Sequence, residues 1–150
     1  DAVDVIDVRF SAALTGSPTA SLDELKTGAA NLIDSQVQPL YSRFNKPIVI
    51  TALYVSTDGG AAQCVGLAVG GCQPLIKVAP DQPDTPVYAL DLTEQQLAYE
   101  ALLYAINDRP WISGFYAYGY NPVVALRDKY YSPRGKPVET LLAAWFARIK

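Results

Sequence analysis

The chain has 150 residues, enough for one domain with its own core, and its 50% hydrophobic and 18% charged residues are a globular composition. A formal net charge of −3 without any run of Lys and Arg argues against nucleic acid as a partner, and no apolar stretch reaches the roughly 18 residues of a membrane span. With no His and only 2 Cys, the usual ligands of zinc and copper are nearly absent, so we predict no metal site.

The first strand and helix are predicted in the amino-terminal third of the chain. The segment Ala2–Phe10 is rich in β-branched residues, which is typical of a strand. Ser21 and Glu24 then form a capping-box pattern, and apolar residues recur at three-to-four spacing as far as Phe44. We therefore expect one long amphipathic helix, with a kink at Pro39.

The second strand is predicted at Pro47–Val55, which is almost continuously apolar, as in a strand of a parallel sheet that is covered on both faces. A Gly- and Pro-rich stretch, Thr57–Leu90, follows it as a long insertion. Within the insertion, Cys64 and Cys72 lie eight residues apart, and we expect them to form a disulfide rather than to bind metal. A disulfide favours an extracellular or cell-surface location.

The remaining elements complete an alternating order of strands and helices. Asp91 or Thr93 is expected to cap a second helix that ends at Asp108–Pro110, a third strand follows at Trp111–Tyr120, and Pro137 begins the last helix. The order β-α-β-α-β-α predicts an α/β fold with a parallel sheet, either doubly wound or part of a barrel. No Gly-x-Gly-x-x-Gly turn follows a strand, so we predict no nucleotide cofactor.

Two stretches carry a family resemblance: Lys46–Tyr54 (KPIVITALY), and Trp111–Tyr116 (WISGFY) continued by Tyr131–Pro137 (YSPRGKP). They are similar to the seventh and eighth strands of retaining glycoside hydrolases with a TIM barrel, of the endo-β-mannanase-like type, and Val5–Phe10 is similar to the sixth strand. The resemblance implies that residues 1–150 are the carboxy-terminal portion of a (β/α)8 barrel, with the insertion at about 57–90. The sequence begins with Asp1 and holds no Met, so we expect a piece of a longer polypeptide.

The resemblance also implies a departure from hydrolytic chemistry. Where the family phrase KPIVITE ends in the glutamate nucleophile, this sequence has Ala52, whose methyl group cannot form a glycosyl-enzyme intermediate. Retaining hydrolysis needs two carboxylates, and the second lies on the family's fourth strand, outside this chain. Whether the protein is an enzyme stays open, and we expect the chain as given to be catalytically incompetent.

Aromatic side chains near the carboxyl ends of the predicted strands are the candidate substrate-binding residues, because aromatic faces cover the apolar faces of sugar rings. We expect a segment of a secreted glycoside-hydrolase-like protein that binds or acts on a β-linked polysaccharide. The alternative is a non-catalytic structural or assembly module derived from a glycosidase barrel. In either case we expect a partner, the remaining barrel portion or another copy of the chain, that covers the open sheet. The candidate residues are Phe10, Tyr54, Tyr116, Tyr118 and Tyr120.

Overall fold

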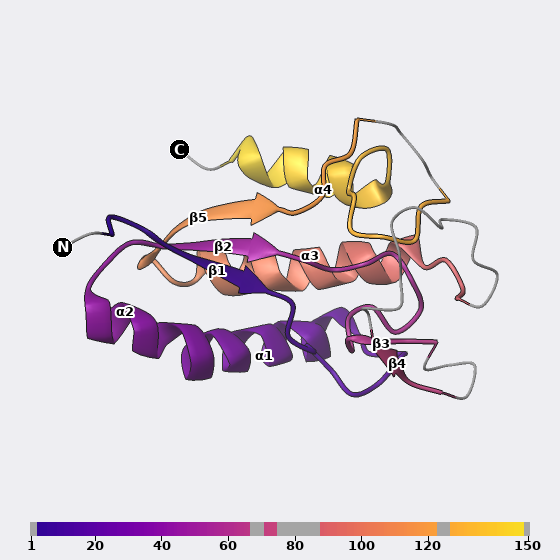
Figure 1. Cartoon of the computed structure of the whole chain (residues 1–150), viewed down its shortest axis with the longest axis horizontal. Coiled ribbons are helices and arrows are strands. Elements are labelled where there is room, and N and C mark those ends of the chain that lie inside the picture. Colours follow the sequence, from indigo (N-terminus) through magenta and orange to yellow (C-terminus); the bar gives the residue numbers. More distant parts are fainter. Residues whose placement is uncertain (1–2, 67–70, 75–87, 123–126, 149–150) are drawn as a thin grey trace.

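The computed structural model describes residues 3–66, 71–74, 88–122 and 127–148, and it confirms the predicted alternation of strands and helices (Figure 1). The order of the elements and their bounds are β1 (Ile6–Phe10), α1 (Leu22–Leu32), η1 (Ile33–Val37), α2 (Gln38–Phe44), β2 (Ile48–Ala52), β3 (Cys64–Val65), β4 (Gln73–Pro74), α3 (Leu92–Asn107), β5 (Ile112–Ala117) and α4 (Pro137–Phe146). The class is α/β.

A three-stranded parallel sheet in the order β1-β2-β5 forms the centre of the fold. The last residues of the three strands lie in register, since Ala52 pairs with Phe10 on one side and with Ala117 on the other. Because the strands are parallel, their carboxyl ends meet at one edge of the sheet, and the loops that follow them lie together at that edge (Figure 1).

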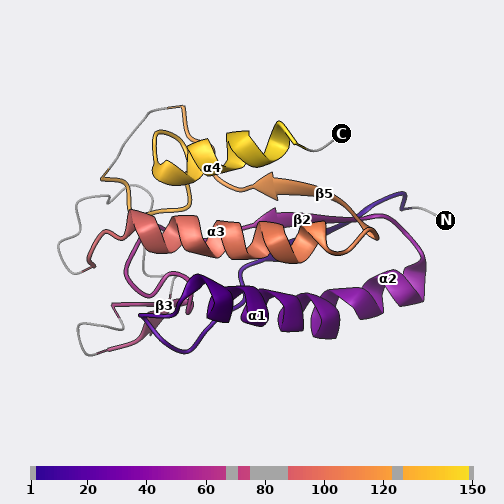
Figure 2. The same ribbon diagram turned by 180° about the vertical axis from the view of Figure 1, so that it is seen from behind.

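The helices α1 and α3 pack against each other and cover one face of the sheet, as the front and back views show (Figures 1 and 2). Alternate strand residues such as Ile48 and Ile50 are fully buried in one hydrophobic core with α1 and α3. Side chains of the opposite phase, such as Asp7, Arg9 and Tyr116, are exposed. The sheet of the described chain therefore has one helix-covered face and one open face.

The predicted long helix is three consecutive helical segments rather than one kinked helix. Its start is confirmed: Ser21 caps α1, and Glu24 completes the capping box. The irregular part is the π-helical turn η1, in which the Gln38 N–H donates to the Ile33 carbonyl. Pro39 follows this turn, has no N–H to donate and crowds the preceding turn, so a wider turn precedes it.

Strands in the structure are shorter than the sequence pattern predicts. The first begins at Ile6 instead of Ala2, and the third ends at Ala117 instead of Tyr120. Hydrogen bonding between strands, which a single strand's composition does not encode, sets these limits. Beyond β5, Gly119 adopts φ +82°, a left-handed conformation that turns the chain away from the sheet.

The described part of the insertion holds a small antiparallel pair, β3 with β4, and the predicted disulfide Cys64–Cys72 is confirmed beside it, with a Cα–Cα distance of 4.9 Å. An isolated bridge joins Thr57 to Leu90 at the two ends of the insertion. Residues 67–70 and 75–87 lie outside the described residues. In the described part of the chain, no helix is long and apolar enough to cross a membrane.

Candidate functional site

The candidate site lies where the carboxyl ends of the three parallel strands meet on the open face of the sheet. Asp7 and Thr51 belong to this face, and the Thr51 hydroxyl donates a hydrogen bond of 2.7 Å to the Asp7 carboxylate across β1 and β2. Tyr116 is the register partner of Thr51 on β5, and its side chain is 65% exposed. The Asp7 carboxylate of β1 and the Tyr116 ring of β5 are thus exposed on this face, whereas Thr51 of β2 between them is 9% exposed.

Tyr118 is the centre of a second cluster at the same edge. Its backbone N–H donates to the Ala52 carbonyl, which places it directly beyond the end of β2. The Arg9 guanidinium lies 5.9 Å from the centre of the Tyr118 ring, and the Tyr131 ring meets it edge to face at 5.8 Å. Tyr118 is still 40% exposed, so these contacts orient the ring and leave part of it free to stack on a ligand.

Tyr120 is held in a different place from Tyr118. Its hydroxyl donates a 2.6 Å hydrogen bond to Glu139 at the start of α4, and this bond raises the pKa of Tyr120. The Arg134 guanidinium lies 5.5 Å from its ring centre. Tyr120 lines a groove between β5 and α4 together with Tyr116, whereas Tyr118 does not line that groove. The structure therefore brings together Tyr116 and Tyr120 on one side, and Tyr118 and Arg9 on the other.

Phe10 and Tyr54 lie in the core. Their side chains are 3% and 0% exposed, and the Tyr54 hydroxyl donates to the Ala12 carbonyl at 2.9 Å. The Tyr54 ring also meets Tyr99 of α3 edge to face at 6.1 Å, so it serves as a link between the loop after β1 and α3. In this chain neither ring reaches the open face, and their predicted contact with a ligand stays a prediction.

Ala52 is completely buried within the core that the sheet shares with its helices. Side chains alternate along a strand, so Ala52 has the phase of the helix-covered Ile48 and Ile50, opposite to Thr51. The Tyr99 hydroxyl of α3 donates to the Ala52 carbonyl at 3.2 Å, which ties the end of β2 to that helix. The side chain at position 52, where the resembled family phrase has its nucleophile, therefore does not reach the open face of the sheet in this chain.

A buried ion pair that the sequence analysis missed braces the loops beside the site. The Lys136 ammonium donates to the Asp128 carboxylate at 3.1 Å, to the Ser56 hydroxyl at 2.9 Å and to the Tyr130 carbonyl at 3.2 Å. Burial lowers the pKa of Lys136, while Asp128 opposes that shift. The cluster joins the loop after β2 to the loop after β5. Its one sequence signal is a Lys within the segment before α4.

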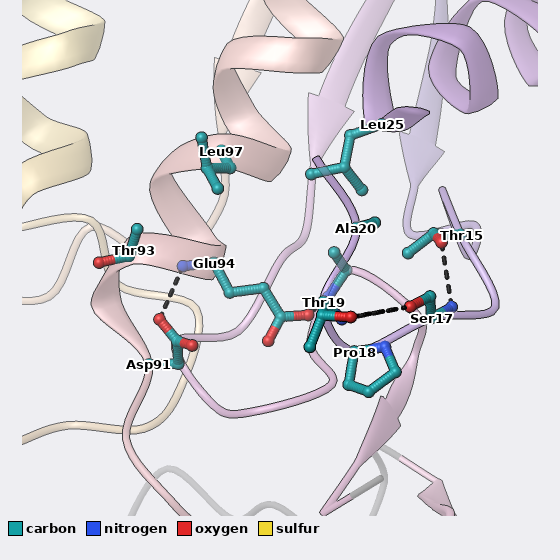
Figure 3. A pocket seen from close by; sticks show the side chains of 11 residues that line it. Thr15, Ser17, Pro18, Thr19, Ala20, Leu25, Asp91, Thr93, Glu94 and Leu97 are labelled. Atoms are coloured by element: carbon teal, nitrogen blue, oxygen red, sulfur yellow. Dashed lines mark hydrogen bonds between the residues drawn. The ribbon is translucent and has the colours of Figure 1, made fainter. Parts of the chain in front are cut away.

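Glu94 braces the other side of the loop after β2 (Figure 3). Its carboxylate accepts hydrogen bonds from the backbone N–H groups of Gly59 (2.7 Å) and Ala61 (2.9 Å). Burial raises the pKa of Glu94 to about 6, although both hydrogen bonds oppose the shift. Asp91 is confirmed as the cap of α3, since its carboxylate accepts a hydrogen bond of 2.8 Å from the Glu94 N–H. The Glu94 side chain does not complete a capping box, because it binds the loop after β2.

Glu94 also lines a pocket of about 190 Å³ between the segment after β1 and the first turn of α3, where its side chain points toward Thr19 (Figure 3). The pocket walls carry hydroxyls and two carboxylates, those of Asp91 and Glu94. Among the residues that the structure describes, His, Cys, Asp and Glu side chains form no group of three or more that could hold a metal ion. The pocket therefore has in its wall a carboxylate, that of Glu94, which is already bound to the loop after β2.

Comparisons with known proteins define what this arrangement is similar to. No family model matches the sequence, and no curated protein matches it. Among solved structures, a GH113 β-1,4-mannanase matches 99% of this chain with a TM-score of 0.64 at 20% identity, and a complex structure of a GH113 β-1,4-mannanase matches 98% with a TM-score of 0.61, also at 20% identity. This chain spans 40% of the length of each mannanase chain. The protein therefore has the fold of part of a TIM barrel, similar to 40% of each of these mannanase chains.

Proposed function

We propose that this chain is a segment of a secreted glycoside-hydrolase-like protein that binds a β-linked polysaccharide on the open face of its sheet. The observation that carries the proposal is the placement of exposed Tyr116 and Tyr118 at the carboxyl ends of parallel strands. Catalytic and binding residues of β/α-barrels gather at that end of the strands. Because the structural neighbours are β-1,4-mannanases, β-1,4-mannan is the first ligand to test.

The proposed mode of binding is stacking combined with hydrogen bonding. The Tyr118 ring is oriented by Arg9 and Tyr131 and offers its free part to the apolar side of a sugar ring. Asp7 lies exposed on the same face, oriented by the Thr51 hydroxyl, and its carboxylate accepts hydrogen bonds from sugar hydroxyls. The Tyr120 ring, held beside α4 by its hydrogen bond to Glu139, extends the proposed binding surface toward that helix.

We further propose that the chain binds without cleaving the polysaccharide on its own. Position 52 carries a methyl group where the resembled family phrase has its nucleophilic glutamate, and a methyl group supplies no nucleophile in either orientation. The disulfide Cys64–Cys72 supports an extracellular or cell-surface location, since disulfides persist in oxidising compartments.

Binding is tested by isothermal titration calorimetry of the chain with β-1,4-linked mannan and glucan oligosaccharides. We expect Tyr118→Ala to weaken mannan-oligosaccharide binding by about tenfold, because a stacked ring contributes on the order of 1 kcal/mol beyond its buried area. Tyr104→Ala is the matched control, since Tyr104 is also 40% exposed but lies on α3. A reducing-sugar assay on the same mixtures is expected to detect no cleavage products.

The second candidate function is a structural module whose degenerate barrel serves assembly, with the remaining barrel portion or another copy of the chain as its partner. An apolar groove beside the edge strand β5 favours this function. It predicts no oligosaccharide binding and no effect of Tyr118→Ala on any property except stability. A titration without heat for either oligosaccharide would therefore select the structural module over the proposed function.

A further inference from the structure

Arg9, Thr51 and Tyr116 form one row across the open face of the sheet. Arg9 of β1 is the register partner of Thr51 of β2, which in turn pairs with Tyr116 of β5. Adjacent strands lie about 4.8 Å apart, so the backbones of Arg9 and Tyr116 are separated by about 10 Å. Arg9 and Tyr116 are exposed, whereas Thr51 is nearly buried. The row therefore presents a cation at one end and an aromatic ring at the other.

The charge of Arg9 is not neutralised by any residue that the structure describes. Its guanidinium lies 5.9 Å from the centre of the Tyr118 ring, and among the described residues it forms no ion pair and no side-chain hydrogen bond. Arg134 also stacks on a tyrosine ring, but its guanidinium donates to the backbone carbonyls of Asn121 and Pro122. The N–H donors of Arg9 therefore remain available to a ligand.

Asp7 lies two residues before Arg9 on the same face of β1, and the two side chains do not form an ion pair. The Asp7 carboxylate instead accepts a hydrogen bond of 2.7 Å from the Thr51 hydroxyl, which directs it across to β2. The spacing along the strand separates the two Cα atoms by about 7 Å. One strand thus offers a ligand an acceptor at Asp7 and a cationic donor at Arg9.

A guanidinium beside an exposed aromatic ring is suited to a sugar that carries a carboxylate. Guanidinium N–H groups bind a carboxylate through two parallel hydrogen bonds, which a neutral hydroxymethyl group cannot accept. Contact with the Tyr118 ring orients the guanidinium, so less side-chain freedom is lost on binding. A sugar stacked on the free part of that ring brings its substituents close to Arg9.

The overall charge of the protein does not favour acidic ligands. The formal net charge is −3, so the chain as a whole does not attract a polyanion. Any preference for an acidic sugar must therefore come from a local contact, and Arg9 supplies that contact on the open face.

We infer that Arg9 selects a β-linked polysaccharide whose sugars carry carboxylate groups, while Tyr118 provides the ring on which the sugar stacks. The inference rests on the proposed function, which it narrows from β-linked polysaccharides in general to acidic ones. The sugar carboxylate accepts hydrogen bonds from the Arg9 guanidinium. Asp7 accepts hydrogen bonds from neutral hydroxyls of the same ligand and disfavours an anion on its own side of Arg9.

The test compares two oligosaccharides of equal length by isothermal titration calorimetry with the chain. One is built of β-1,4-linked mannose and the other of β-1,4-linked mannuronic acid, which has a carboxylate in place of the exocyclic hydroxymethyl group. We expect the wild type to bind the mannuronate oligosaccharide about tenfold more tightly, because the paired hydrogen bonds add to the stacking that both ligands share. Arg9→Gln is expected to abolish this preference. Arg9→Lys keeps the charge without the two parallel bonds, so it should retain only part of it.

Two further variants serve as controls. Arg43→Gln is the matched control, because Arg43 is also exposed and stacks on the Phe44 ring at 5.1 Å, but lies on α2, which precedes the amino end of β2. It is expected to keep the preference of the wild type. Asp7→Asn removes a like charge near the bound carboxylate and is expected to increase the preference for mannuronate. Circular dichroism of each variant verifies that it is folded.

The outcomes separate this inference from the proposed function. Equal affinity of the wild type for the two oligosaccharides would overturn the inference and leave the proposed function standing. A preference for mannuronate that survives Arg9→Gln would also refute it, because another residue would then bind the carboxylate. Binding of neither oligosaccharide would reject the proposed function and, with it, the inference.

Discussion

Lys136 and Asp128 form an ion pair in which the Lys136 side chain is 0% and the Asp128 side chain 8% exposed, with 3.1 Å between Nζ and Oδ2. The same ammonium group donates to the Ser56 hydroxyl, 80 residues earlier in the chain. Two loops that follow different strands are therefore joined through one side chain. This pair holds the loops beside the exposed tyrosines in place.

Replacing Lys136 with Met leaves the Asp128 carboxylate buried without its countercharge. We expect Lys136→Met to lower the free energy of unfolding by about 3 to 5 kcal/mol, measured by urea denaturation followed by circular dichroism. The control is Arg43→Met, the removal of an exposed cation on α2, with an expected change within about 0.5 kcal/mol. Equal effects of the two changes would show that the buried pair contributes nothing specific.

Glu94 predicts a pH dependence of stability. Its pKa in the folded protein is raised to about 6 from the usual 4.5, so the folded state binds the proton more tightly than the unfolded state. Its stabilising contribution is therefore fully present below pH 4.5 and is lost as pH rises through 6. A shift of this size corresponds to about 2 kcal/mol.

The measurement compares the wild-type protein with Glu94→Gln, which cannot ionise, in urea denaturation at pH 4.5 and pH 7.5. Between pH 4.5 and pH 7.5 we expect the wild type to lose about 2 kcal/mol of unfolding free energy relative to Glu94→Gln. Glu100→Gln, the same change further along α3, is the control. A difference that is independent of pH would contradict the raised pKa of Glu94.

At Gly28, within α1, we expect a change to alanine to destabilise the protein. In an exposed helix interior Gly→Ala gains about 1 kcal/mol, but a Cβ at Gly28 would overlap the backbone carbonyl oxygen of Leu14. Because that atom belongs to the backbone, α1 or the loop after β1 must shift. We expect Gly28→Ala to lower the melting temperature, with a loss of about 1 to 3 kcal/mol. For Gly16→Ala, where a Cβ meets nothing within 4 Å, we expect almost no change.

The disulfide predicts a redox-dependent stability. Cys64 and Cys72 close a loop with a sequence separation of 8, for which the chain-entropy model gives a stabilisation of about 2 to 3 kcal/mol. The double variant Cys64→Ser/Cys72→Ser is expected to lose this amount under oxidising conditions. Dithiothreitol should leave the unfolding free energy of the double variant unchanged. It should lower the unfolding free energy of the wild type to that of the variant. A wild-type protein that is indifferent to dithiothreitol would contradict this stabilising role.

Local features of the fold were predictable from the residues that carry them. Ser21 and Asp91 are helix caps that act within three residues, and Pro137 begins α4 as expected. The apolar run that contains β2 indicated a strand of a parallel sheet, and the order of elements indicated the α/β class. The expected cover of this strand on both faces is not seen in the described chain, in which helices cover one face of the sheet. These signals act over a few residues or follow from hydrophobic periodicity, so they survive in any tertiary context that buries the same face.

The sequence by itself thus determined the element order, the helix caps, the parallel sheet and the pairing of two cysteines. Only the tertiary structure decided that the Ala52 side chain lies on the helix-covered face of β2 and that Glu94 and Lys136 are buried. It also decided that Tyr118 and Tyr120 lie in separate clusters. The phase of a strand depends on which side the helices cover, and a shift of one residue reverses it. Contacts such as that of Lys136 with Ser56 join loops that lie side by side only in the assembled sheet. A local sequence pattern therefore cannot predict them.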